Sequence, residues 1–200
     1  MLRVYGMSAS GNCHKVRMAL EALALPYAWT EIDPSRGETR TPGFLAMNPN
    51  GKVPVLEIEP GTYLPESNAI LWYLAEGTPL LPSDSLQRAQ VLQWLFFEQY
   101  SHEPYIAVAR FLRKFHPDPE SQRALAESKM SGGYRALEVM EGRLAQERFF
   151  VGGRYSIADI ALYAYTHVAE DGGFDLERLS AVRAWLDRVR TQPRCAAMPG

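Results

Sequence analysis

The residues best suited to chemistry stand in the segment Ser8-Ala-Ser-Gly-Asn-Cys-His-Lys, which joins a short apolar run to an amphipathic one. Ser10 and Cys13 have the spacing of the C-x-x-C redox motif with serine in place of the first cysteine, which excludes a dithiol cycle within the motif. A turn from a strand into a helix gathers backbone N–H groups and the helix dipole, and this favours a bound anion. The Ser10 hydroxyl could donate to that anion or to a thiolate, or it could cap the helix. Cys13 could be a reactive thiol, but we interpret it as an inert, small apolar residue.

Two further segments could hold the backbone and the charged ends of a small peptide. Val53-Pro54 follows Asn48-Pro-Asn-Gly-Lys, and a proline at the start of a strand is a candidate cis bond. The N–H and C=O of Val53 could then pair with an extended peptide-like ligand. Ser67 could cap the next helix or bind a carboxylate with its hydroxyl and N–H, and Glu66 suits an ammonium. Together these two residues fit an amino-acid zwitterion.

The elements that must position these residues alternate between strand and helix over residues 1–77. An apolar stripe at helical spacing predicts a helix that includes Val16 to Leu23 and ends before Pro26, and a second helix begins at Ser67. Residues 33–50 read as a loop with at most a short helix. The pattern predicts an α/β unit with a mixed sheet. Its strands are expected at residues 2–5, 27–32, 53–58 and 62–64.

The strand signal disappears after the proline-containing segment 78–85, which we interpret as a linker. Residues 86–200 are predicted to form an all-helical domain, a helical bundle. One long helical stretch is expected over 86–115, with a possible kink at Pro104, and a second over 120–147.

Three local signals refine this helical half. Gly132 and Gly133 should weaken the middle of the second long helix by about 1 kcal/mol each relative to alanine. Ser156 and Asp159 form a capping box, which we interpret as a folding signal without chemistry. An apolar stripe over 182–189 predicts the last helix.

Composition excludes several classes of protein. The 200 residues are 46% hydrophobic and 22% charged with a net charge of −2, which argues against a nucleic-acid-binding face. The longest apolar stretches have about seven residues, against roughly 18 for a membrane span. Only Cys13 and Cys195 are present, so neither a disulfide framework nor a cysteine zinc site is expected. The first residues lack an apolar signal core, and we therefore expect a cytoplasmic protein.

Four segments of the chain, in their order and spacing, resemble those of bacterial cytosolic glutathione S-transferases of the serine and cysteine type. The resemblance covers nearly the whole chain. It implies a thioredoxin-like N-terminal domain, a helical C-terminal domain and a homodimer. The four segments are Ser10-Gly-Asn-Cys-His-Lys-Val-Arg, Asn48-Pro-Asn-Gly-Lys-Val-Pro-Val-Leu, Pro65-Glu-Ser-Asn-Ala-Ile-Leu-Trp-Tyr-Leu and Tyr155-Ser-Ile-Ala-Asp-Ile.

The resemblance also implies how glutathione is held on the first domain. Val53 with Pro54 would hold the cysteinyl backbone, and Glu66 with Ser67 the γ-glutamyl end. Lys52 would hold the glycyl carboxylate, although a solvated lysine is an alternative interpretation.

For the thiol, the resemblance places Ser10 at the position of the activating serine or cysteine. Ser8 remains a rival because it stands in the same turn, and Cys13 would be next in line. Tyr5 lies too early in its strand to be assigned the role that tyrosine has in the tyrosine-type classes.

The second substrate is expected to bind in an apolar pocket contributed partly by the helical domain. Met7, Tyr105 and Phe111 are the predicted lining residues, and Phe115 and His102 are further candidates. Each of these residue types is more often found in a core than in a pocket. His102 has no ligand-spaced partners, and no metal site is expected.

The resemblance therefore implies a glutathione S-transferase that stabilises the glutathione thiolate for attack on a small hydrophobic electrophile, with a role in detoxification. Glutathione is the co-substrate, and neither a metal, a nucleic acid nor a membrane is an expected partner. One alternative is a glutathione-dependent thiol–disulfide oxidoreductase or peroxidase. Another is a non-catalytic protein-interaction scaffold, which the retained ligand residues argue against.

Overall fold

The computed structural model describes residues 1–198 and divides the chain into two compact units. Within the described residues, the first unit is Met1–Thr78 together with residues 193–198, and the second is Pro79–Gln192. The sequence analysis places residues 86–200 in the helical domain, whereas the structure groups residues 193–198 with the N-terminal unit. The last helix ends at Arg190, and residues 193–198 form no further helix.

A four-stranded mixed sheet organises the N-terminal unit. Its strand order is β2-β1-β3-β4, with β1 parallel to β2 and antiparallel to β3, and β4 antiparallel to β3. The sheet is mixed, as the sequence pattern predicts, and the arrangement is the thioredoxin-like one that the resemblance implies. The strands are β1 Leu2–Gly6, β2 Tyr27–Glu31, β3 Val55–Glu59 and β4 Thr62–Pro65.

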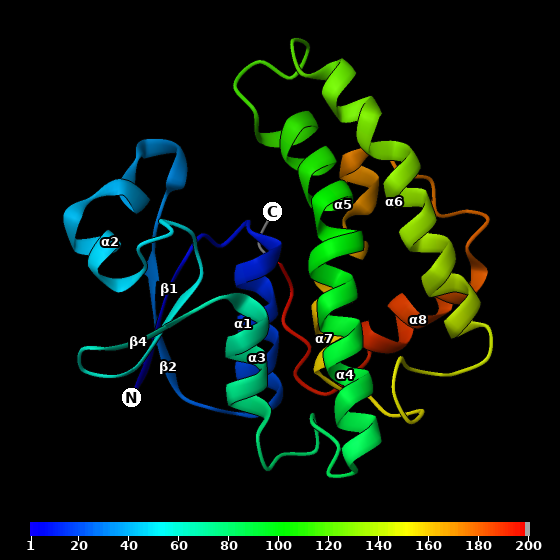
Figure 1. The fold of residues 1–200 in the computed structure, drawn as a ribbon, viewed down its shortest axis with the longest axis horizontal. Coiled ribbons are helices and arrows are strands. Elements are labelled where there is room, and N and C mark those ends of the chain that lie inside the picture. The colour runs from blue at the N-terminus through cyan, green and yellow to red at the C-terminus, as the bar shows by residue number, and fades with distance from the viewer. Residues whose placement is uncertain (199–200) are drawn as a thin grey trace. The chain divides into compact units, whose positions relative to one another are not determined.

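Helices cover both faces of this sheet. Figure 1 shows α1 (Gly11–Ala22) and α3 (Ser67–Ala75) on one side of the sheet and α2 (Pro42–Met47) on the other. The predicted apolar stripes are buried: Val16 and Leu20 of α1, and Ile70 and Leu71 of α3, have no exposed surface. Burial of such a side chain contributes about 1.5–3 kcal/mol, which is why these two helices pack on the sheet.

The helical unit begins with one continuous helical segment from Ser85 to Phe115. It consists of α4 (Ser85–Phe97), a π-helical turn (Glu98–His102), α5 (Glu103–Arg110) and a second π-helical turn (Phe111–Phe115). The Glu103 N–H bonds to the Glu98 carbonyl, five residues back. A π-helical turn therefore precedes Pro104 and accommodates it, since the proline stands in the first turn of α5 where its missing N–H costs little.

The remaining helices complete this unit, and α6 runs beside α5 (Figure 1). They are α6 Arg123–Leu144, α7 Ile157–Thr166, a 3-10 turn Ala169–Gly172 and α8 Ser180–Arg190. No helix within residues 1–198 is both long and apolar enough to cross a membrane.

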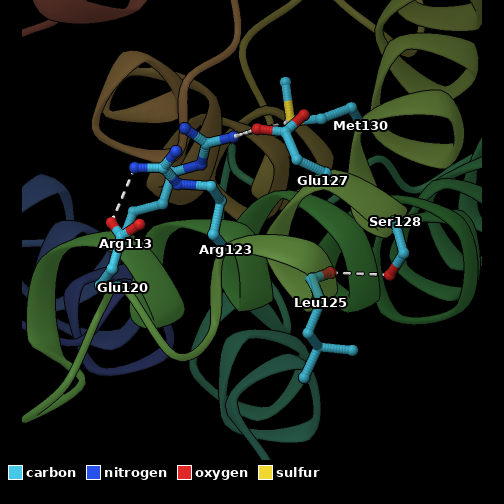
Figure 2. A network of polar contacts seen from close by, with 7 residues as sticks. All are labelled: Arg113, Glu120, Arg123, Leu125, Glu127, Ser128 and Met130. Atoms are coloured by element: carbon cyan, nitrogen blue, oxygen red, sulfur yellow. Dashed lines mark hydrogen bonds and ion pairs between the residues drawn. The ribbon is translucent and has the colours of Figure 1, made fainter.

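Polar contacts on the surface surround the start of α6 (Figure 2). Arg113, in the second π-helical turn, pairs with Glu127 of α6, and Arg123 pairs with Glu120 at 2.7 Å. Exposed ion pairs of this kind contribute about 0–1 kcal/mol each. Their contribution to the stability of the helical unit is therefore small.

The two adjacent glycines of α6 have a packing role that the sequence did not reveal. A Cβ at Gly132 would overlap the ring of Tyr105 from α5, and a Cβ at Gly133 would overlap the ring of Phe174. The helix runs through both positions without a break. The two glycines thus offset their low helix propensity by allowing aromatic rings to lie directly on the backbone of α6.

Asp159 joins three segments of the helical unit. The capping box is confirmed, because the Asp159 carboxylate accepts the Ser156 N–H at 3.0 Å while the Ser156 hydroxyl caps α7. The same carboxylate also accepts the Phe150 N–H at 3.2 Å and the Trp185 indole N–H at 3.0 Å. Complete burial raises the pKa of Asp159 to about 6, and this outweighs the hydrogen bonds from Trp185, Phe150 and Ser156, which lower it.

Replacing Gly133 should separate packing from helix propensity. We expect Gly133→Ala to lower the free energy of unfolding by about 1–3 kcal/mol, because the new methyl group must displace Phe174. Gly142→Ala is the matched control, since nothing lies within 4 Å of a Cβ at that position of the same helix. It should raise the free energy of unfolding by up to about 1 kcal/mol. Urea unfolding measures both, and equal stability of the two variants would contradict the packing role.

The buried Asp159 carboxyl predicts a specific pH dependence of stability. Its folded pKa of about 6 lies above the ordinary value of 3.8, so the folded state binds the proton more tightly. Its contribution is fully present below about pH 4 and is lost as the pH rises through 6. Urea unfolding of the wild type and Asp159→Asn between pH 4 and 7 should show a stability difference that shifts against the wild type as the pH rises. A constant difference would show that Asp159 does not titrate in this range.

Candidate functional site

Three turns of the chain meet at one end of the N-terminal sheet. Tyr5 of β1 pairs with Val55 of β3, and Val55 pairs with Pro65 of β4. Neighbouring strands lie about 4.8 Å apart, so this row places the chain leaving β1, the chain entering β3 and the chain leaving β4 side by side. The predicted residues on these three turns are Ser10, Val53 and Ser67.

Ser10 is the N-cap of α1. Its backbone is extended, with φ −80° and ψ 128°, and its Oγ accepts the Cys13 N–H at 3.4 Å. This distance is longer than the 2.7–3.2 Å of a typical N–H···O bond. No acidic side chain stands in the first turn of α1 to offset the positive end of its dipole. The start of this helix is therefore suited to an anion, as the sequence predicts.

Cys13 lies one turn inside α1 and is completely buried. Burial raises the pKa of its thiol to about 12, and hydrogen bonds from the Ser10 side chain and the Met7 backbone offset this only in part. Because the thiolate is the reactive form, this thiol is inert at neutral pH. The structure thus supports the interpretation of Cys13 as a small apolar residue.

Ser8 has its hydroxyl engaged within the N-terminal unit. Its Oγ donates to a carboxylate oxygen of Glu31 at 2.7 Å and accepts from Arg17 at 3.1 Å. A hydroxyl has one proton to give, so Ser8 cannot also donate to a ligand while this contact lasts. Ser10 remains the better candidate of the two serines. Sequence reasoning missed Glu31, which lies 23 residues from Ser8 and gives no local signal.

The loop that enters β3 is held by Asn48, a second residue that sequence reasoning missed. Its side-chain amide donates to the Lys52 carbonyl at 2.8 Å, and its side-chain oxygen accepts the Asn50 N–H at 3.1 Å. Asn48 is buried, whereas Lys52 is exposed. The buried Asn48 side chain therefore holds the loop through backbone groups of Asn50 and Lys52, and the Lys52 side chain lies at the surface.

Val53 and Pro54 follow this loop, and the peptide bond between them is cis, as the sequence suggests. The strand begins two residues later than expected, at Val55, where pairing with β1 and β4 starts. Val53 makes no backbone hydrogen bond to any other residue between 1 and 198. Its N–H and C=O thus stand outside the sheet ladder, where a bound peptide could use them.

The turn from β4 into α3 differs in one respect from expectation. Glu66, not Ser67, is the N-cap; Ser67 is the first helical residue and is buried. Glu66 has φ 70°, a conformation that non-glycine residues rarely adopt and that often marks functional sites. Its side chain makes no capping bond, so the first N–H groups of α3 lack a cap from it.

The Ser67 hydroxyl links α3 to α1. It donates to the Asn12 side-chain oxygen at 3.2 Å and accepts from the Lys15 ammonium at 3.4 Å. Asn12 is two residues after Ser10, so this bond fixes the start of α3 beside the start of α1. The Ser67 N–H, rather than its hydroxyl, is then the group available to a carboxylate.

The Tyr5 hydroxyl, unlike the Val53 backbone and the Ser67 N–H, is already engaged in a hydrogen bond. It donates to Glu57 at 3.0 Å. Partial burial raises the pKa of Tyr5, and the hydrogen bond and negative charge of Glu57 raise it further. A tyrosine held in this way is a poor thiol activator, which agrees with leaving it unassigned.

The residues predicted to line the electrophile pocket are divided between the two units, with Met7 in the first and Tyr105 and Phe111 in the second. Within the helical unit, the Tyr105 ring packs on Gly132, and Phe111 is 51% exposed. The pocket stays a prediction.

The two further candidates for this pocket have partners of their own inside the helical unit. His102 is buried with its Nε2 at 2.9 Å from the Thr166 hydroxyl. Phe115 lies under the Arg110 guanidinium, which is 4.8 Å from its ring centroid.

The helical unit also contains a hollow of about 510 Å³ to which none of the predicted site residues contributes. Its lining includes the parallel rings of Tyr163 and His167, whose centroids are 4.6 Å apart. Burial lowers the pKa of His167, although its bond to the Tyr163 carbonyl partly offsets this. Within residues 1–198, no three His, Cys, Asp or Glu side chains are grouped so that they could hold a metal ion.

Comparison with known proteins agrees with the fold of both units. The family model of the glutathione S-transferase N-terminal domain matches residues 9–76, and that of the C-terminal domain matches residues 95–193. This chain belongs to the glutathione S-transferase family. Among curated relatives, the disulfide-bond oxidoreductase YfcG of Escherichia coli (strain K12) is 32% identical over 189 residues, covering 91% of this chain and 87% of that protein.

Solved structures extend the comparison over the full length. A glutathione S-transferase from Pseudomonas fluorescens [Pf-5] is 55% identical with a TM-score of 0.97, covering 100% of this chain and 99% of that one. A glutathione transferase from Burkholderia graminis, with two glutathione molecules bound per subunit, is 28% identical with a TM-score of 0.83. The match covers 97% of this chain and 85% of that one.

The burial of Cys13 predicts that its thiol is dispensable. We expect Cys13→Ala to keep kcat/KM for a glutathione-dependent reaction within about twofold of the wild type, since the thiol is protonated at neutral pH. In a Cys195→Ala background, the remaining Cys13 should resist iodoacetamide at pH 7 in the folded protein and react after unfolding. Rapid alkylation of folded protein would show instead that Cys13 is an accessible thiolate.

Proposed function

We propose that this chain is a glutathione transferase that binds glutathione on its N-terminal unit and uses Ser10 to stabilise the thiolate. The proposal is supported above all by the backbone groups of Val53 and Ser67. The Val53 N–H and C=O stand outside the hydrogen bonding of the sheet, and the Ser67 N–H, in the first turn of α3, has no acceptor within that helix. Both residues lie at the same end of the sheet as Ser10. An extended tripeptide can satisfy such groups, because its own backbone supplies the missing donors and acceptors.

The Ser10 hydroxyl is sufficient to shift the ionisation of a bound thiol. A free thiol has a pKa near 8.5, and lowering it by about two units requires roughly 2.7 kcal/mol. One charge-assisted hydrogen bond supplies about 1.5–3 kcal/mol, and a helix N-terminus about 0.3–1. Ser10 therefore acts as a hydrogen-bond donor that keeps its own proton, while the thiolate attacks the electrophile and the displaced group leaves.

The ends of glutathione are assigned by their charge. The γ-glutamyl carboxylate would accept the Ser67 N–H at the positive end of the α3 dipole, and its ammonium would face Glu66. Val53 with Pro54 would hold the cysteinyl backbone. Lys52, which is exposed beside them, would meet the glycyl carboxylate.

A small hydrophobic electrophile is the proposed second substrate, with Met7, Tyr105 and Phe111 as the lining of its pocket. A cytoplasmic location and a role in detoxification belong to the same proposal, as implied by the family resemblance.

We also propose a homodimer, and an exposed apolar stripe on α4 and the π-helical turn that follows it supports this. Leu92, Phe96 and Tyr100 recur every four residues and are 37%, 68% and 85% exposed. Exposed apolar side chains that gather on one face often mark a protein–protein interaction site.

A second candidate function is glutathione-dependent reduction of disulfides. The similarity to a curated relative named as a disulfide-bond oxidoreductase favours it. In that chemistry glutathione supplies the attacking sulfur, and Ser10 stabilises a thiolate without itself being oxidised. Comparing the reduction of hydroxyethyl disulfide with the conjugation of 1-chloro-2,4-dinitrobenzene separates the two functions, since the faster reaction identifies the favoured chemistry.

Substituting Ser10 tests the proposed role directly. Ser10→Ala should lower kcat/KM by about 10- to 100-fold, the equivalent of one charge-assisted hydrogen bond, with little change in KM for glutathione. Ser35→Ala, at an exposed serine of the same unit, is the control and should match the wild type. Full activity of Ser10→Ala would remove Ser10 from the mechanism.

A further inference from the structure

The carboxylate of Glu31, at the end of β2, grips the turn from β1 to α1. One carboxylate oxygen accepts the Ser8 backbone N–H at 2.7 Å, and the other accepts the Ser8 hydroxyl at 2.7 Å. Trp29 of the same strand donates its indole N–H to that second oxygen, also at 2.7 Å. Both oxygens are thus engaged, and two of the three bonds fall on a single residue of the turn.

Arg17 of α1 closes this arrangement from the other side. It donates to the Ser8 hydroxyl oxygen at 3.1 Å, and its guanidinium carbon lies 4.2 Å from the centroid of the Trp29 ring. Ser8 is therefore connected to a strand and to a helix at once. A residue held by charged partners on both sides has little freedom to rotate or to move with its turn.

The position of Ser8 determines that of Ser10, because both belong to one tight turn. The Ser10 N–H donates to the Met7 carbonyl at 3.0 Å, which closes a four-residue turn with Ser8 in its second position. At the other end, the Ile32 N–H bonds to the Gly6 carbonyl at 3.0 Å and joins the ends of β1 and β2. The Glu31 carboxylate thus adds side-chain contacts to a turn that two backbone hydrogen bonds already hold, from Ser10 to Met7 and from Ile32 to Gly6.

Glu31 lies at the surface and is ionised at neutral pH. Partial burial would raise its pKa, but the hydrogen bonds from Ser8 and Trp29 and the charge of Arg17 lower the pKa of Glu31 below its usual value. Hydrogen bonds to an ionised carboxylate are roughly twice as strong as neutral ones. Exposure to water weakens them, so the expected effect is one of alignment and not of global stability.

We propose that Glu31 is a positioning residue, which aims the Ser10 hydroxyl at the glutathione sulfur by clamping both polar groups of Ser8. This rests on the proposed function of Ser10. Glu31 itself touches neither glutathione nor the electrophile, and the same clamp keeps the Ser8 hydroxyl out of the reaction.

The test compares Glu31→Ala and Glu31→Gln with the wild type. Glutamine retains one acceptor oxygen, so Glu31→Gln should lose less than Glu31→Ala. We expect kcat to fall about tenfold in Glu31→Ala and about threefold in Glu31→Gln, with KM for glutathione within about twofold, as for a misaligned catalytic group. The absorbance of bound thiolate, followed against pH, should show that the pKa of the glutathione thiol rises in both variants, and more in Glu31→Ala than in Glu31→Gln.

Glu21→Gln is the matched control. Glu21 is another carboxylate of the N-terminal unit that accepts a side-chain bond, from the Tyr27 hydroxyl at 2.9 Å. It lies ten residues beyond the start of α1, about 15 Å along the helix. This variant should keep both the wild-type kcat and the wild-type thiol pKa.

The outcomes separate this role from the function on which it rests. A wild-type protein that lowers the thiol pKa, together with a Glu31→Ala variant that does so equally well, overturns the positioning role alone. A rise in KM without a fall in kcat also overturns it, because that would place Glu31 in binding. A wild-type protein that neither binds glutathione nor lowers its pKa overturns the proposed function and the positioning role together.

Discussion

The pairing of β1, β3 and β4 is the constraint on which the candidate site depends. The register that sets Tyr5 opposite Val55, and Val55 opposite Pro65, brings three turns to one end of the sheet. A one-residue slip in either pair would turn the buried faces of the strands outward, so the hydrophobic core enforces the register. The site therefore draws its geometry from the core beneath it, and this suits a fold whose active residues stand on turns.

Polar side chains then fix the turns that the sheet brings together. Asn48 shapes the loop before β3 from within, and the Ser67 hydroxyl ties α3 to Asn12 of α1. These contacts leave a few backbone groups unused within a well-braced frame. A preorganised site of this kind spends little binding energy on ordering itself, and that favours selective binding of an extended peptide. In the helical unit, the buried Asp159 carboxylate has a comparable role, because it joins the segments of Phe150, Ser156 and Trp185 by hydrogen bonds.

Much of the fold could be predicted from the sequence because its signals are local. The apolar stripes of α1 and α3, the capping box of α7 and the alternation of strand and helix all lie within short windows of chain. The resemblance to a family then supplied candidate positions such as Ser10 and Val53. What escaped prediction depends on residues far apart: the bond of Glu31 to Ser8 spans 23 residues, and the packing of Gly133 on Phe174 joins separate segments. Such contacts produce no periodic pattern in the sequence. A glycine in a helix is therefore interpreted only as destabilising the helix, because the residue that packs on it is not known.

The central claim is that the start of α1, the Val53-Pro54 segment before β3 and the start of α3 form one glutathione site. A crystal structure of this protein soaked with reduced glutathione tests it most directly. The account predicts that the Val53 N–H and C=O pair with the cysteinyl backbone, that the γ-glutamyl carboxylate meets the Ser67 N–H, and that the sulfur lies within about 3.5 Å of the Ser10 hydroxyl. Glutathione bound elsewhere, or with its sulfur directed away from Ser10, would contradict it.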